Sequence, residues 1–210
     1  MGNNSCGTHS VVYGKTSDHV IGVNVVMSDG HAATFETVAA AELESKLTRS
    51  DLEGVIYREM PRIAAAQREE IERRFPRIMR RVSGYNLDSM LDGGPTNLAR
   101  MVVGSEGTLV AVTEARLNLE PLPAMRGLAV LHFHDLIEAM EATVATLEPQ
   151  PSAVELVDDM IIQRSRESLG FARRMTFVEG DPRALLRGEF FGESQRELDA
   201  KVEGLRQDME

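Results

Sequence analysis

Residues 2–30 read GNNSCGTHSVVYGKTSDHVIGVNVVMSDG. Glycines at positions 2, 7 and 14 permit positive φ and a close backbone approach, and the Asn, Ser and Thr side chains among them offer short hydrogen-bond donors. Residues 20–27 are rich in β-branched side chains and precede the turn signal SDG, so we expect a glycine-rich loop that leads into a strand and a tight turn. The loop matches neither a Walker A motif nor GxGxxG, and its composition fits an ordinary turn as well as a cofactor loop.

A second glycine motif, GSEGT, occupies residues 104–108. Two glycines three positions apart suit a tight turn before a strand at 109–119, which Pro121 and Pro123 should end. Glu106 has a carboxylate that can accept hydrogen bonds from a ligand or from the loop itself. Composition alone leaves a structural turn and a ligand-binding turn equally open.

Three stretches in this order resemble the second half of the flavin domain in the FAD-linked oxidase family, which vanillyl-alcohol oxidase typifies. They are residues 2–30, SGYNLD at 83–88, and MVVGSEGTLVAVTEARLNLEPLP at 101–123. The resemblance is strongest to the branch of glycolate oxidase, D-lactate dehydrogenase and D-2-hydroxyglutarate dehydrogenase. PSAVELVDDMI at 151–161 is similar to the start of the substrate-binding cap in that branch.

The resemblance implies an α+β fold in two parts. Residues 1–123 would form the second lobe of a vanillyl-alcohol-oxidase-type FAD-binding domain, with a helical insertion at about 36–82, and residues 124–210 the first part of a ferredoxin-like α/β cap. Family members place a complete βαβ lobe before the GNNSCG stretch and continue the cap beyond this point. We therefore expect an internal fragment that is inactive alone, exposes an apolar face and tends to self-associate.

Carried over position by position, the resemblance implies FAD-contacting residues in both glycine motifs. The first motif would line the isoalloxazine and phosphate region, and the second would close the other side, in this set: Asn4, Ser5, Gly7, Thr8, His9, Tyr13, Gly14, Glu106, Gly107 and the backbone near Val112. His9 fits equally a loop histidine bonded to a nearby carbonyl, and Tyr13 fits a packing residue better. The chain has Val110-Ala111 where the family has Gly-Ile, and no catalytic or metal-ligating residue is assigned.

The implied parent enzyme oxidises a small 2-hydroxy acid such as glycolate, D-lactate or D-2-hydroxyglutarate by hydride transfer to flavin. Its electrons would pass to an iron-sulfur segment or a quinone-linked carrier. Two alternatives stay open: a flavoenzyme of the same family that acts on another alcohol or an ether-lipid precursor, and a noncatalytic α/β module that binds a partner through residues 58–81.

Composition limits the partners and the compartment. The chain has 210 residues and a formal net charge of −10, which disfavours a nucleic acid or an anionic bilayer as the main partner. Its single cysteine, Cys6, excludes an intramolecular disulfide, and no Cys/His spacing matches a structural zinc site. Neither a secretory leader nor a long apolar run is present, so we expect a cytoplasmic protein without a membrane span.

Local patterns predict the remaining elements. Ser50 and Glu53 read as a capping box, and Pro61 and Pro76 should divide the insertion into two or three helices. The eight arginines at 58–81 should lie on a solvated face and pair with glutamates. After the proline-rich exit, strands are expected at 128–133, 153–157 and 184–191, and helices at 158–169, from 135, and from 195 almost to the end.

Overall fold

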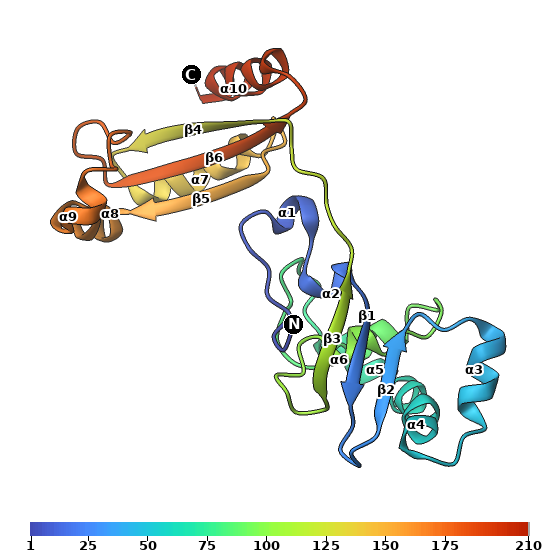
Figure 1. Ribbon diagram of the computed structural model, residues 1–210. Helices are drawn as coiled ribbons and strands as arrows, with labels where there is room; N and C mark the ends of the chain where they lie inside the picture. Colours follow the sequence, from blue (N-terminus) through green and yellow to red (C-terminus); the bar gives the residue numbers. More distant parts are fainter. Residues whose placement is uncertain (210) are drawn as a thin grey trace. The chain divides into compact units, whose positions relative to one another are not determined.

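The computed structural model describes residues Met1–Met209 and divides into two compact units (Figure 1). The first unit comprises Met1–Gly7 and Tyr13–Glu120, and the second comprises Thr8–Val12 and the chain from Pro121 onward. Each unit combines helices with one three-stranded sheet, so the fold class is α+β, as the sequence predicts. No helix within the described residues is both long and apolar enough to cross a bilayer.

The sheet of the first unit has the order β2-β1-β3 and is antiparallel throughout. The strand expected after the glycine-rich loop is confirmed as β1, Val20–Val26. The chain returns directly as β2, Ala32–Glu36, a strand that was not predicted from the sequence. The SDG turn explains this hairpin: Gly30 has a φ of 84°, and the Met27 N–H donates to the His31 carbonyl at 2.9 Å. The expected strand at 109–119 is β3, Ala111–Leu117.

The core of the first unit lies on one side of this sheet. Val23 and Val25 of β1 are 2% and 1% exposed, and Phe35 of β2 packs edge-on against the Tyr57 ring. Short helices and turns complete the unit: α2 (Thr16–His19), the 3-10 helix η1 (Leu87–Met90) and α6 (Ala99–Val102). The short helix α1 (Ser10–Tyr13) belongs to the second unit except for its last residue. Because α6 contributes buried Ala99, Met101 and Val102, it anchors the GSEGT turn that follows it.

Three helices form the stretch between β2 and residue 75, in agreement with the expected number: α3 (Ala40–Leu47), α4 (Leu52–Ala66) and α5 (Arg68–Arg74). The prediction that Pro61 separates two helices was wrong, because this proline lies inside α4. The boundary between α4 and α5 is at Gln67.

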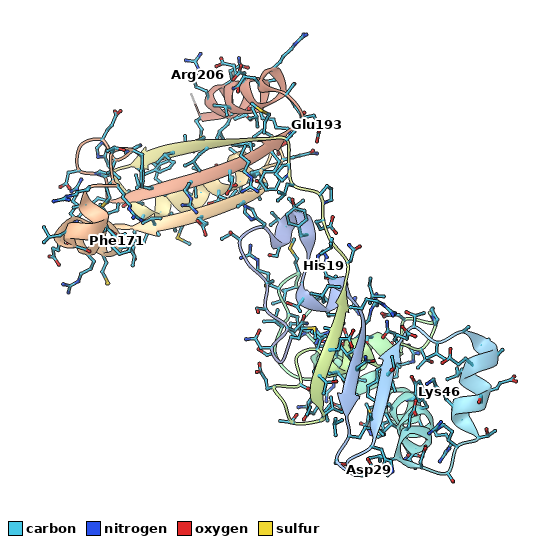
Figure 2. The ribbon with its side chains drawn as sticks, viewed as in Figure 1. His19, Asp29, Lys46, Phe171, Glu193 and Arg206 are labelled. Carbon is cyan, nitrogen blue, oxygen red and sulfur yellow. The ribbon has the colours of Figure 1, made fainter. Side chains whose placement is uncertain are left out.

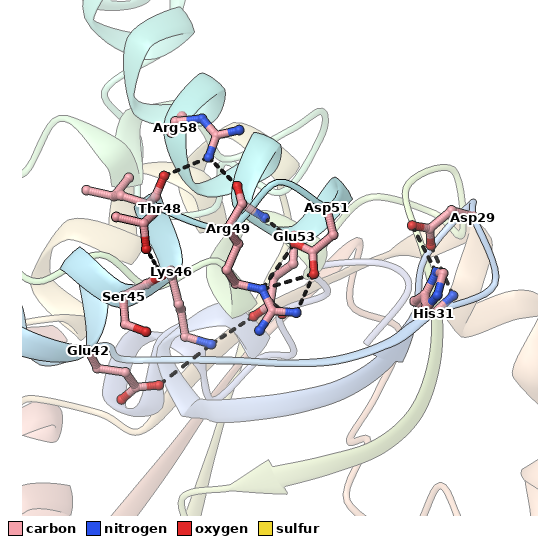
Figure 3. Close-up of polar contacts among 12 residues, drawn as sticks. Asp29, His31, Glu42, Ser45, Lys46, Thr48, Arg49, Asp51, Glu53 and Arg58 are labelled. Carbon is pink, nitrogen blue, oxygen red and sulfur yellow. Dashed lines mark hydrogen bonds and ion pairs between the residues drawn. The ribbon is translucent and has the colours of Figure 1, made fainter.

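The predicted cap of α4 was also displaced by one residue. The N-cap is Asp51, not Ser50, and its carboxylate accepts from the Gly54 N–H at 3.1 Å. Glu53 does not complete a capping box; its carboxylate binds Lys46 instead, at 2.8 Å (Figure 3). Glu53 therefore pairs with a charged residue of the preceding helix α3 and not with the backbone at the start of its own helix.

Asp51 makes the start of α4 sensitive to acid. The Arg49 guanidinium and the Gly54 N–H donate to its carboxylate and lower its pKa from 3.8 to about 2. Because the folded pKa lies below the unfolded one, this contribution is complete above the unfolded pKa of 3.8 and is lost as the pH falls through about 2. We expect the protection of the Gly54 amide, which is its exchange rate relative to that of the unfolded chain at the same pH, to fall over this window, as measured by NMR. Asp51→Asn, which cannot titrate, should lack this acid-induced fall in protection. Equal protection profiles in both proteins would contradict the assignment.

The arginine-rich stretch forms the expected intrahelical pairs. Arg62 binds Glu59 at 2.5 Å, Arg68 binds Glu72 at 3.1 Å, and Glu70 accepts from both Arg73 and Arg74. All these side chains are at least 42% exposed, so each pair contributes little to stability.

The second unit has an antiparallel sheet in the order β4-β6-β5. The three predicted strands are confirmed as β4 (Met125–Phe133), β5 (Ala153–Asp158) and β6 (Ala184–Gly192). The predicted helices are confirmed as α7 (Leu136–Thr146), α8 (Asp159–Glu167) and α10 (Gln195–Met209), with α9 (Leu169–Ala172) added after α8. Asp135 and Asp158 cap α7 and α8 through their side chains.

The two faces of β6 differ in chemistry. Phe190 and Leu186 are 0% and 1% exposed, and Phe190 packs with Leu198 and Leu205 of α10. Alternate residues point to the opposite face, which carries Arg187 and Glu189. The face that α10 covers therefore forms one core, whereas the opposite face combines the buried Leu185 with these charged side chains.

Candidate functional site

Residues 2–7 of the N-terminal loop and the GSEGT turn lie side by side in the first unit. The Glu106 N–H donates to the Gly2 carbonyl at 2.7 Å, and the Gly104 N–H donates to the Met1 carbonyl at 3.3 Å. Gly104 has a φ of +86°, and a Cβ there would lie 3.1 Å from the Cβ of Asn4. Only glycine fits this close approach without displacement, so the GSEGT turn is built to seat the N-terminal loop.

Asn4 is the most buried polar residue of this pair of loops, at 1% exposure. Its Oδ1 accepts from the Ser17 N–H at 2.9 Å, which fixes the orientation of the amide. Its Nδ2 is buried and has no hydrogen-bond partner among the described residues. A buried donor left without an acceptor is costly, so the geometry favours an acceptor atom supplied by a ligand.

The GSEGT turn is held internally by hydroxyl groups. The Thr108 Oγ1 donates to the Ser105 carbonyl at 2.5 Å and lies 2.7 Å from the Tyr85 Oη. Glu106 is exposed and has a φ of 53°, an uncommon value for a residue with a side chain. Gly107 has a φ of +74° and open space around its Cα, so a ligand can approach the backbone there.

The rest of the predicted N-terminal set supports the loop through its backbone. The Ser5 carbonyl accepts from the Thr16 N–H and Oγ1, at 3.2 and 2.8 Å. The Tyr13 carbonyl lies 2.6 Å from the His19 Nε2, and Gly14 takes a φ of +78° beside Asp18. Gly7, like Gly107, has nothing within 4 Å of the position of a Cβ. Gly7 therefore leaves room, whereas the other three positions shape the loop.

Thr8 and His9 fall in the second unit, apart from the eight other predicted residues. The His9 Nε2 lies 3.0 Å from the Glu189 Oε2, and its ring is centred 5.2 Å from that of Phe191. One polar partner of His9 is thus a carboxylate, 180 residues away along the chain.

Val112, the last predicted position, lies in β3 opposite Val25 and is 40% exposed. Its neighbour Val110 packs against the core of the first unit. The Cβ at position 110, which departs from the family pattern, therefore has a structural role in this chain.

Asn86 was not assigned a role from the sequence, although it lies in SGYNLD. Its Nδ2 donates to the carbonyls of Arg100 and Val103, both at 2.9 Å, and its side chain holds the end of α6 just before GSEGT. The motif itself was the available signal, and a buried asparagine that caps a neighbouring segment is a common reason for such a motif.

Two curated relatives match almost the whole chain. D-2-hydroxyglutarate dehydrogenase of Pantoea ananatis is 29% identical over 208 residues, which cover 96% of this chain and 20% of the relative. D-2-hydroxyglutarate dehydrogenase of Escherichia coli is 31% identical over 212 residues, which cover 98% of this chain and 21% of the relative.

Over nearly its whole length the chain is similar to these dehydrogenases, which agrees with the resemblance of its motifs to the FAD-linked oxidase family. It spans about a fifth of the length of the two relatives. A solved structure of alkyldihydroxyacetonephosphate synthase matches 99% of this chain and 31% of its own, with a TM-score of 0.54 and 16% identity, which is a likeness of fold. No protein-family model matches the chain.

The paired loops of this chain fit a flavin cofactor. FAD has carbonyl and phosphate oxygens that accept hydrogen bonds, and the buried Asn4 Nδ2 is a donor without an acceptor among the described residues. The open spaces at Gly7 and Gly107 allow a flat ring or a phosphate to approach the backbone. Three independent features of the first unit therefore agree with such a group.

Proposed function

We propose that this chain supplies part of the flavin site of a FAD-dependent dehydrogenase that oxidises a small 2-hydroxy acid, such as D-2-hydroxyglutarate, D-lactate or glycolate. The observation that carries the proposal is the buried Asn4 Nδ2, which has no hydrogen-bond partner among the described residues and lies at the contact of the two glycine motifs. The relatives named D-2-hydroxyglutarate dehydrogenase support the substrate class.

Bound FAD supplies the hydride acceptor in this proposal. The chain's own residues bind and orient it: the Asn4 Nδ2 donates to a flavin oxygen, and the backbone at Gly7 and Gly107 lies against the cofactor. Ser5, Tyr13 and Gly14 hold the loop in place, while Glu106 and Val112 close the other side. No residue of this chain is assigned as the acid or base that handles the substrate proton.

The remaining assignments belong to the same proposal. Residues 1–123 form part of the flavin domain, and residues 124–210 the start of the substrate cap. Thr8 and His9 would face the flavin in the assembled site. The enzyme is cytoplasmic and passes electrons to an iron-sulfur segment or a quinone-linked carrier.

The first test is a titration of the 210-residue chain with FAD, followed by flavin fluorescence and by melting temperature. Saturable binding is expected in the natural chain. Asn4→Asp keeps the acceptor for the Ser17 N–H but removes the unpartnered donor, and it should weaken FAD binding about tenfold or more. The matched control is Asn3→Asp, which adds the same charge at an exposed neighbour and should bind FAD normally.

Two outcomes would count against the proposal. Absence of saturable FAD binding both in this chain and in the full-length protein would favour the alternative of a noncatalytic interaction module. Binding by the full-length protein alone would mean that the flavin site needs residues outside this chain. Equal affinities in the two aspartate variants would remove Asn4 from the site. Reduction of a dye acceptor by the full-length protein, measured with D-2-hydroxyglutarate, D-lactate and glycolate, then separates the substrates from one another.

A further inference from the structure

The second unit contains an apolar cavity of about 220 Å³. The sheet contributes Val130, Val157 and Leu185 to its lining, and Ile162 of α8 contributes a further wall. Ile162 and Leu185 are only 1% and 2% exposed, so this part of the lining is firmly packed. The cavity therefore has a buried apolar floor.

Aromatic side chains enclose the other side of the cavity. Phe171 of α9, which Figure 2 labels, and Phe177 from the following segment line it, and they are 62% and 46% exposed. Large aromatic residues that remain this exposed beside an apolar cavity indicate a surface that gains from covering an apolar ligand.

Two arginines give the cavity a polar end. Arg187 is neutralised by an ion pair with Glu155, which extends from the neighbouring strand β5. Arg174 also lines the cavity, and its side chain makes no hydrogen bond or ion pair within Met1–Met209. Asp181, seven residues further along the chain, is paired with Arg166. The lining thus carries one positive charge without a counter-charge among the described residues.

We propose that this cavity binds a small aliphatic monocarboxylate. A cavity of about 220 Å³ lies below the roughly 300–1,000 Å³ of pockets that hold drug-sized ligands, so the ligand must be small. The chain lies against Val157, Ile162 and Leu185, and the carboxylate pairs with Arg174. One unmatched cation fits a monoanion, and the apolar lining disfavours a ligand with several charges.

The test is isothermal titration of the 210-residue chain with octanoate, and with octan-1-ol and octylamine as neutral and cationic controls of the same length. We expect saturable binding of octanoate, weaker binding of octanol and none of octylamine. Arg174→Gln should weaken octanoate binding about tenfold, because a charge-assisted contact is lost. Arg173→Gln is the matched control: it removes the adjacent arginine, which is not part of the lining, and should leave the affinity unchanged.

A second variant tests the cavity itself. Ser165→Leu places a larger side chain in the lining and should abolish octanoate binding, while circular dichroism and melting confirm the fold. The proposal is overturned if octanoate shows no saturable binding or if octanol binds as well as octanoate. It is also overturned if Arg174→Gln and Arg173→Gln bind octanoate with the same affinity. These measurements need no FAD, so their failure is distinguishable from that of the proposed function.

Discussion

Replacing Lys46 by methionine is expected to lower the free energy of unfolding of the first unit by about 3 kcal/mol. The Lys46 Nζ lies 2.8 Å from a carboxylate oxygen of Glu53, and the two side chains are only 17% and 9% exposed (Figure 3). The ammonium also lies 5.1 Å from the centre of the Tyr57 ring. Loss of the cation leaves a largely buried carboxylate whose remaining basic partner, Arg49, is 3.5 Å away.

Urea unfolding followed by tyrosine fluorescence measures this effect selectively. The three tyrosines of the chain, at positions 13, 57 and 85, all lie in the first unit. Arg62→Met is the control, because it breaks an exposed pair with Glu59 and should change stability little. The double variant Lys46→Met/Glu53→Leu should recover much of the loss, since the carboxylate is removed as well. An unchanged midpoint for Lys46→Met would mean that water solvates Glu53 adequately.

Substitution of Gly104 by alanine is the second large effect, at about 2–3 kcal/mol. A residue with a Cβ is disfavoured at a φ of +86° by roughly 1–2 kcal/mol, and here the Cβ would also lie 3.1 Å from that of Asn4. The two loops must then separate, which displaces the Asn4 amide and should also weaken FAD binding.

Gly107→Ala separates the two causes. Gly107 has a similar φ of +74°, but its Cβ position is open, so we expect a loss of only about 1–2 kcal/mol. Unfolding of both variants is followed by the same tyrosine signal, since Tyr85 contacts Thr108 in this turn. If the two alanine variants are equally stable, the close approach between Gly104 and Asn4 does not contribute to the free energy of unfolding.

Local signals made most elements of the fold predictable. Asp135 and Asp158 precede helices and cap them, because a side-chain cap depends on residues only two or three positions away. The strand β2 was not anticipated, because its sequence, AATFE, lacks the run of β-branched residues that marks β1. Asp51 replaced Ser50 as a cap because Glu53 pairs with Lys46 on another helix.

The candidate site could be predicted only in part. The resemblance identified both glycine motifs, but their direct backbone contact, from Glu106 to Gly2, joins positions over a hundred residues apart. No local pattern encodes such a pairing. The same holds for His9, whose partner Glu189 could not be inferred from the loop in which His9 lies.

The division of the chain into units restricts how it can be cut or recombined. The polypeptide passes from one unit to the other after Gly7, after Val12 and after Glu120. A gene fragment that starts at Pro121 would encode the β4-β6-β5 sheet without Thr8–Val12, and Glu189 would lose its contact with His9. Exchange of this second unit between homologous genes at a single crossover would therefore pair a sheet from one parent with a five-residue segment from the other. Residues 8–12 and the β6 strand are expected to be inherited together.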